Sequence, residues 1–198
     1  MQDSIIQPNT GQAPLSSFVT PALIDASSVT SADKQLELFA LHRRIMHSEG
    51  GYYYYTGGTG GFSAKQVTPV TEDVTPSWRN DVYYNVYAQR QIVKGRGGAN
   101  GVIGAGGLYA EFDAKDFGAM DTPDAFLSAK RAALAAIHTL DVSPSAIVDS
   151  GGGYHCYWYF DAFLSFDRQG TNDTFAAALA AWVGRVGGDD GAKDIARI

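Results

Sequence analysis

Two acidic side chains two positions apart are the first feature of this sequence that could do chemistry. Glu111 and Asp113 end an apolar stretch, residues 108 to 113, that is typical of a strand. Side chains at alternate positions of a strand lie on one face, so the two carboxylates would converge there. A divalent cation such as Mg²⁺ or Mn²⁺, which prefers oxygen ligands, would relieve their repulsion. A solvated strand face would show the same alternation, so the pair alone leaves both interpretations open.

A triple glycine followed by a histidine is the second feature, and it joins two expected strands. Glycine lets backbone amides approach a ligand closely, so the loop could contact phosphate oxygens through Ser150, Gly152 and Gly153. His155 opens the second strand and could donate a hydrogen bond to a triphosphate, with a purely structural histidine as the alternative. Cys156 would point to the opposite face, so a Cys–His nucleophile pair is not expected.

Two further groups of charged residues are less specific. The turn after the last expected helix holds Asp189 and Asp190, and an acidic turn by itself is ordinary surface chemistry. A segment upstream of residue 101 carries three basic residues that could contact a triphosphate or a template backbone, or could simply be solvated: Arg90, Lys94 and Arg96.

The elements that must position these residues follow from hydrophobic periodicity and from glycine and proline. Residues 1 to 29 contain prolines and many Ser, Thr and Gln without a sustained period, which predicts a flexible arm. Helices are expected at about 30–49, 122–140 and 174–186, the second one announced by Thr122-Pro123-Asp124. Strands are expected at 52–55, 82–88, 108–113, 145–149 and 154–160. This interleaving predicts α/β or α+β with a mixed central sheet.

Composition restricts the class of protein. With 198 residues, of which 45% are hydrophobic, the chain suits one compact domain. It shows neither a secretory signal nor an apolar run near the ~18 residues of a membrane helix. Cys156 is the single cysteine, which excludes an intrachain disulfide and predicts a reducing, cytoplasmic compartment. The net charge of −6 predicts weak intrinsic affinity for DNA, because neutralisation of phosphates supplies most non-specific binding.

Taken together, three segments resemble the motifs of the archaeo-eukaryotic primase superfamily, and more narrowly the primase-polymerases of phages and plasmids. The segments are Glu111-Phe112-Asp113, Ile147-Val148-Asp149-Ser150-Gly151-Gly152-Gly153-Tyr154-His155-Cys156-Tyr157-Trp158, and Gly188-Asp189 leading to Asp194-Ile195-Ala196-Arg197. They occur in the family's order, and the resemblance covers about residues 80 to 198. The segment that ends in His155 and aromatic residues is the most specific. Glu111 departs from the aspartate that the family usually has at that position.

The resemblance implies an α+β fold, in which an RRM-like mixed sheet packs with an N-terminal α/β module and the active site lies in the cleft between them. It also implies roles for individual residues. The cation ligands would be Glu111, Asp113 and Asp189, with Asp190 and Asp194 as less favoured third ligands; the nucleotide's phosphates would be contacted by His155, and Arg197 could stand in for an arginine that relatives place beyond the third motif.

The implied activity is template-directed nucleotidyl transfer by a DNA primase or DNA polymerase that serves DNA replication. Two Mg²⁺ or Mn²⁺ ions would activate the primer 3′-hydroxyl and stabilise the leaving pyrophosphate. The implied partners are a single-stranded DNA template, a primer, nucleoside triphosphates and a helicase domain or protein, in the host cytoplasm if the protein is phage-encoded. Residues 30–198 would form the catalytic domain. Because the chain stops inside an expected element, we expect it to be part of a longer protein.

Two alternatives stay open from the sequence. One is a non-catalytic RRM-like module that binds nucleic acid, which would need no acidic triad. The other is a rolling-circle-type metal-dependent nuclease, although such sites generally use a His-x-His pair that this sequence does not contain.

Overall fold

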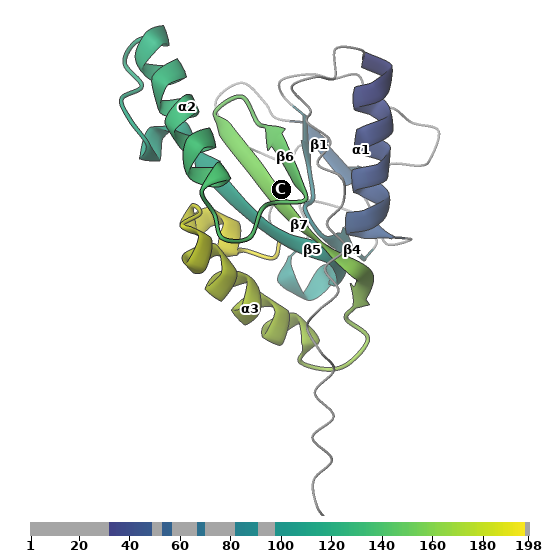
Figure 1. Ribbon diagram of the computed structural model, residues 1–198. Coiled ribbons are helices and arrows are strands. Elements are labelled where there is room, and N and C mark those ends of the chain that lie inside the picture. The colour runs from purple at the N-terminus through teal and green to yellow at the C-terminus, as the bar shows by residue number, and fades with distance from the viewer. Residues whose placement is uncertain (1–31, 49–52, 57–66, 70–81, 91–97, 197–198) are drawn as a thin grey trace, which may run out of the picture.

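The computed structural model describes residues 32–48, 53–56, 67–69, 82–90 and 98–196 (Figure 1). Within these ranges the elements, in chain order, are α1 (Ala32–His47), β1 (Tyr53–Thr56), β2 (Val67–Pro69), β3 (Val82–Tyr84), β4 (Ala88–Gln89), the 3-10 helix η2 (Ala99–Gly101), β5 (Val102–Asp113), η3 (Ala114–Asp116), α2 (Pro123–His138), β6 (Ala146–Asp149), β7 (Gly153–Ser165), α3 (Thr171–Val186) and η4 (Asp190–Lys193). The arm predicted for residues 1–29 lies outside the described residues.

A four-stranded sheet with the order β4-β5-β7-β6 forms the centre of the fold. Every pairing in it is antiparallel, so the structure is α+β, whereas the predicted mixture of parallel and antiparallel pairs is wrong. The reason is the position of β7. The strands β5 and β6, which α2 connects, run in the same direction, but β7 lies between them and pairs with both.

A smaller sheet, ordered β2-β1-β3, is built from the N-terminal half and is also antiparallel. The single strand predicted over residues 82–88 is wrong, because its two halves, β3 and β4, belong to different sheets. Asn85 lies at the break. Its side chain donates to the carbonyl of Tyr87 (2.6 Å), and its own carbonyl accepts from His47 Nε2 of α1 (2.8 Å). Such a local side-chain bond competes with strand pairing and turns the chain.

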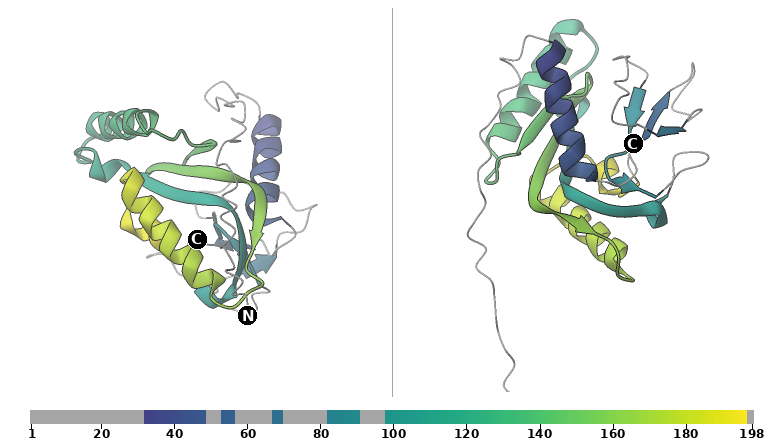
Figure 2. Two further views of the ribbon diagram at one scale, coloured as in Figure 1. Left: turned by 60° about the horizontal axis from the view of Figure 1, so that its bottom comes forward. Right: turned by 90° about the vertical axis from the view of Figure 1, so that its right-hand side faces the viewer.

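The helices cover both faces of the four-stranded sheet. Figure 2 shows β5 and β7 as strongly bent strands, with α3 on the inner side of the bend and α1 on the other side. On the α3 side, Trp158 of β7 packs against Trp182 with ring centroids 5.0 Å apart. On the α1 side the approach is so close that a Cβ at Gly106 would lie 1.7 Å from the carbonyl oxygen of Ile45. Helices therefore cover both faces of this sheet, with α3 on one face and α1 on the other.

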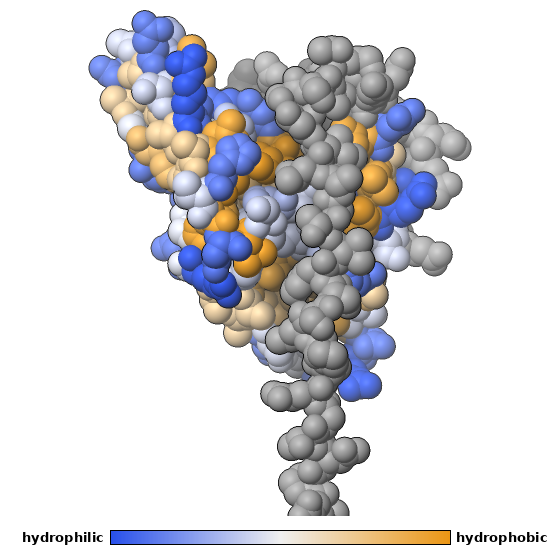
Figure 3. Space-filling model, viewed as in Figure 1, coloured by the Kyte–Doolittle hydropathy of each residue, from blue (hydrophilic) through white to orange (hydrophobic). Residues whose placement is uncertain are grey.

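The predicted start of α2 is confirmed by its cap. The hydroxyl of Thr122 accepts a hydrogen bond from the amide of Ala125 (3.2 Å), and Pro123 occupies the first turn, where its missing N–H costs nothing. In the part of the chain that the structure describes, no helix is both long and apolar enough to cross a membrane. Some apolar side chains remain on the surface alongside α2 and α1 (Figure 3), among them Leu127 and Leu41.

Candidate active site

The end of β5 carries the two acidic residues that the sequence analysis singled out. Glu111 pairs with His155 and Asp113 pairs with Gly153 across the β5–β7 ladder. Residues directly opposite one another in an antiparallel pair share a face, so both carboxylates and the imidazole lie on the α1 side of the sheet. A Cβ at Gly153 would lie 2.2 Å from the carbonyl oxygen of Phe112. The glycine therefore allows β7 to approach the end of β5.

Glu111 and His155 are close neighbours on this face. The Oε1 of Glu111 lies 3.5 Å from the Nε2 of His155, and the Tyr109 hydroxyl is 3.4 Å from Oε2. The ring of Tyr109 also meets that of His155 edge-on, with centroids 5.4 Å apart. Only 8% of Glu111 is exposed, so its carboxylate interacts with these polar neighbours in place of bulk water.

Asp189 reaches the same region from the other side of the sheet. The helix α3 ends at Val186, the φ of 73° at Gly187 lets the chain reverse, and Gly188 then packs on Ala110. The amide of Asp189 donates to the carbonyl of Glu111 (2.7 Å). Among the described residues, β4 pairs with β5 near Gly104 and Val102 and not as far as Glu111, so this bond lies on the part of the edge that β4 does not cover.

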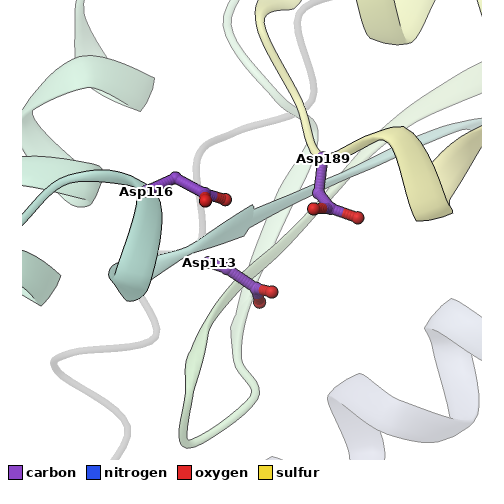
Figure 4. A group of neighbouring side chains, drawn as sticks. All are labelled: Asp113, Asp116 and Asp189. Atoms are coloured by element: carbon purple, nitrogen blue, oxygen red, sulfur yellow. The ribbon is translucent and has the colours of Figure 1, made fainter. Parts of the chain in front are cut away.

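Three carboxylates meet where β5 ends. One oxygen from each of Asp113, Asp116 and Asp189 lies within 4.8 Å of the others, and Figure 4 shows the three side chains pointing toward a common space. Lys115 forms an ion pair with Asp113, and its Nζ is 3.8 Å from Asp189 Oδ2. The hydrogen bond to Asp113 raises the pKa of Lys115. Hard oxygen donors at this spacing can hold a divalent cation, and exposed acidic clusters also occur without one.

The neighbouring acids of the C-terminal turn are directed elsewhere. Asp190 pairs with Lys193 (2.5 Å), and 88% of its side chain is exposed. Asp194 accepts a hydrogen bond from the amide of Ala196 (2.8 Å). Asp189 itself accepts from the amide of Gly191 (2.7 Å) through Oδ1. Of the three candidates for the third ligand, the structure brings Asp189 next to Asp113.

The turn between β6 and β7, which contains the triple glycine, is closed by hydrogen bonds within the turn. The amide of Ser150 donates to the carbonyl of Gly153 (3.1 Å), and the amide of Gly151 donates to the carboxylate of Asp149 (2.8 Å). Lys130 of α2 holds the same carboxylate at 2.7 Å. These two amides serve the turn itself, which limits the predicted phosphate contacts to the Ser150 hydroxyl and the remaining glycine backbone.

The predicted basic contacts fall mostly outside the described residues, which exclude Lys94, Arg96 and Arg197. Arg90 is exposed and follows β4, where its amide donates to the carbonyl of Gly101 (2.6 Å). Nothing among the described contacts connects its side chain with the acidic cluster.

Asp116 and Lys115 belong to the cluster although the sequence motifs did not single them out. The short helix η3 turns the chain directly after Asp113 and brings both back to the cluster. An acid three positions after a strand-terminal aspartate is the signal that could have indicated this.

A buried polar layer adjoins the site on the α1 side. His42 of α1 is hydrogen-bonded to the Tyr159 hydroxyl (2.8 Å), and its ring contacts Tyr157 at 4.3 Å between centroids. Burial, together with the nearby His47 and His155, lowers the pKa of His42 to about 3. Burial also raises the pKa values of Tyr157 and Tyr159 above their ordinary range. These groups are therefore neutral near pH 7 and form the uncharged wall behind His155.

Comparison with protein-family models, with curated proteins and with solved structures finds no match to this chain.

Proposed function

We propose that this chain is the catalytic domain of a DNA primase-polymerase, which transfers nucleotides to a primer end with the help of Mg²⁺ or Mn²⁺. The observation that carries the proposal is the meeting of three distant segments. Asp113 of β5 lies beside Asp189 from the turn after α3, and the same strand sets Glu111 against His155 of β7. These are the three segments whose order and residues resemble the primase superfamily.

The arrangement of the elements supports the same proposal. The order β5-α2-β6-β7-α3, with β7 between β5 and β6, corresponds to the first five elements of an RRM-like β-α-β-β-α-β unit. In such a unit a fourth strand after the second helix would pair with the edge of the first strand. Here the Asp189 segment follows α3 and bonds to that edge of β5 through Glu111. On this interpretation α1 and the small sheet would be the N-terminal module.

The donor set fits the cations that the proposal requires. Asp113, Asp116 and Asp189 offer carboxylate oxygens close together, which is the chemistry that Mg²⁺ and Mn²⁺ prefer. Asp113 and Asp189 would hold the cations, with the exposed Asp116 at the rim of the cluster. Bound there, divalent cations would supply Lewis-acid activation of a hydroxyl and stabilisation of charge on phosphate oxygens.

The chain's own residues would bind and orient the nucleotide. His155 would donate a hydrogen bond from a ring N–H to a phosphate oxygen. A triphosphate could then contact both His155 and cations held at the acidic cluster. Lys115, whose Nζ lies between Asp113 and Asp189, would balance their charge when no cation is bound. Catalysis by such a site is mainly positioning and electrostatic stabilisation, which demands fixed side chains. The strand ladder and the buried layer around His42 supply that rigidity.

The substrates would be a single-stranded DNA template, a primer and nucleoside triphosphates, with a helicase domain or protein as partner. With a net charge of −6, the chain would bind DNA weakly without such a partner.

The test is extension of a labelled primer on a DNA template, with dNTPs and Mn²⁺ or Mg²⁺. We expect the parent protein to extend the primer and Asp113→Asn to lose extension while its circular dichroism spectrum stays unchanged. Template cleavage without extension would favour a nuclease. Binding of DNA with neither reaction would favour a non-catalytic module.

A further inference from the structure

The carboxylate of Glu111 is separate from the acidic cluster, although it lies on the same strand face as Asp113. Among the residues that the structure describes, the group of three acids whose oxygens all lie within 4.8 Å of one another is Asp113, Asp116 and Asp189, and Glu111 does not belong to it. Its Oε1 instead lies 3.5 Å from His155 Nε2. Glutamate is one methylene longer than aspartate, and this length gives the side chain the reach to do this.

The surroundings of Glu111 favour an interaction of its carboxylate with protein side chains over coordination of a cation. The residue is buried, and both of its carboxylate oxygens have polar neighbours, His155 on one side and the Tyr109 hydroxyl on the other. Its backbone is held as well, because its carbonyl accepts from the amide of Asp189. A buried carboxylate needs such partners to stay charged, and ligation of a solvated cation would require it to leave them.

A carboxylate next to one ring nitrogen of a histidine determines which nitrogen carries the proton and how the ring is turned. Tyr109 adds a second constraint, because its ring packs edge-on against the imidazole with an interplanar angle of 83°. His155 is thus held from two positions, 109 and 111, on the same face of the facing strand. This fixes the direction in which the other ring nitrogen of His155 can contact a phosphate.

We propose that Glu111 is a positioning residue that orients His155 toward the nucleotide's phosphates, and that the divalent cations are held by the aspartates of the cluster without it. This inference rests on the proposed function and changes the expected role of Glu111 from cation ligand to positioning residue. Glu111→Gln then weakens nucleotide binding and leaves cation binding intact, whereas Asp113→Asn removes cation binding.

The experiment has two binding readouts. Mn²⁺ binding is followed by electron paramagnetic resonance without nucleotide, and the KM for dATP and kcat are measured in primer extension. For Glu111→Gln we expect a Mn²⁺ Kd within about twofold of the parent and a dATP KM raised about tenfold, the size of one hydrogen bond to a charged group, with little change in kcat. For Asp113→Asn we expect loss of Mn²⁺ binding.

A double variant tests whether the effect runs through His155. Because Glu111→Gln and His155→Gln would remove the same interaction, the double variant should raise the KM no more than the worse single variant does. Additive effects, an unchanged KM in Glu111→Gln, or loss of Mn²⁺ binding in Glu111→Gln equal to that in Asp113→Asn would each overturn the inference. If the parent protein itself neither binds Mn²⁺ nor extends a primer, it is the proposed function that fails.

Discussion

The backbone amide of Asp189 donates a hydrogen bond to the carbonyl oxygen of Glu111 at 2.7 Å. This hydrogen bond and the packing of Gly188 on Ala110 hold the turn after α3 against the edge of β5, where the Asp189 carboxylate lies next to Asp113. The proposed active site depends on this junction, because no local feature of either segment would bring the two acids together.

The first prediction concerns the choice among the acids of the turn. Asp189→Asn removes a carboxylate from the cluster, yet its amide oxygen can still accept from the amide of Gly191. We expect primer extension to fall by roughly 100-fold, the usual size of one electrostatic contribution at a reacting centre. Asp190→Asn is the matched control, since Asp190 is exposed and pairs with Lys193. Equal losses in the two variants would contradict the assignment of Asp189.

The second prediction concerns the turn that introduces His155. In Gly153→Ala the new Cβ would meet the Phe112 carbonyl at 2.2 Å, so β7 must move away from β5. We expect the free energy of unfolding to fall by about 1–3 kcal/mol, as for other overpacked sites. Gly152→Ala is the control, because a Cβ there has no neighbour within 4 Å. Urea denaturation of both variants measures the difference, and similar stabilities would show that the close approach is not rigid.

The third prediction concerns pH and the buried His47. Burial lowers its pKa from 6.5 to about 4, even though the carbonyl of Asn85 accepts from Nε2. Below pH 6.5 the unfolded chain therefore binds a proton at His47, whereas the folded chain binds it only when the pH falls to about 4. The contribution to stability is present above pH 6.5 and is lost as the pH falls toward 4, by at most about 3 kcal/mol.

The measurement for His47 is the free energy of unfolding between pH 4 and 7.5, in the parent and in His47→Gln. The glutamine can still donate to the Asn85 carbonyl but does not titrate, so the slope with pH should be smaller. His42, which also has a lowered pKa, keeps part of the dependence in both proteins. Identical slopes would show that His47 is protonated alike in the folded and unfolded states.

How far the sequence predicted this structure is clearest from particular residues. Local signals succeeded where the physics is local: Thr122 and Pro123 marked the start of α2, and alternation put Glu111 and Asp113 on one face with Cys156 on the other. They failed over residues 82–88, because a strand's partner is decided by tertiary pairing, and Asn85 sends the two halves to different sheets.

The same distinction applies to the candidate site. The resemblance to the primase superfamily singled out Asp189, but its neighbour Asp190 is chemically equivalent in sequence. The two residues are distinguished only by the turn after Gly187 and by the hydrogen bond from the Asp189 amide to β5. Asp116 was missed because its spacing from Asp113 points to the cluster only if a 3-10 turn follows the strand, and the antiparallel sheet was missed because nothing local shows that β7 inserts between β5 and β6.

The fourth prediction concerns Cys156, which lies on the face opposite His155 and is fully buried. Burial raises the pKa of its thiol to about 12, so the thiolate needed for reaction is scarce near neutral pH. We expect Ellman's reagent at pH 8 to label the native protein very slowly and the urea-unfolded protein at once. Rapid labelling of the native protein would mean that the sheet opens or that the helical layer over β7 is loose.

The most direct test of the proposed site is a crystal of the protein soaked with Mn²⁺ and a non-hydrolysable dATP analogue, with anomalous scattering used to locate the ions. The proposal predicts Mn²⁺ within coordination distance of the carboxylates of Asp113 and Asp189, with the triphosphate reaching His155. Ions bound elsewhere, or a nucleotide seated away from the end of β5, would contradict it.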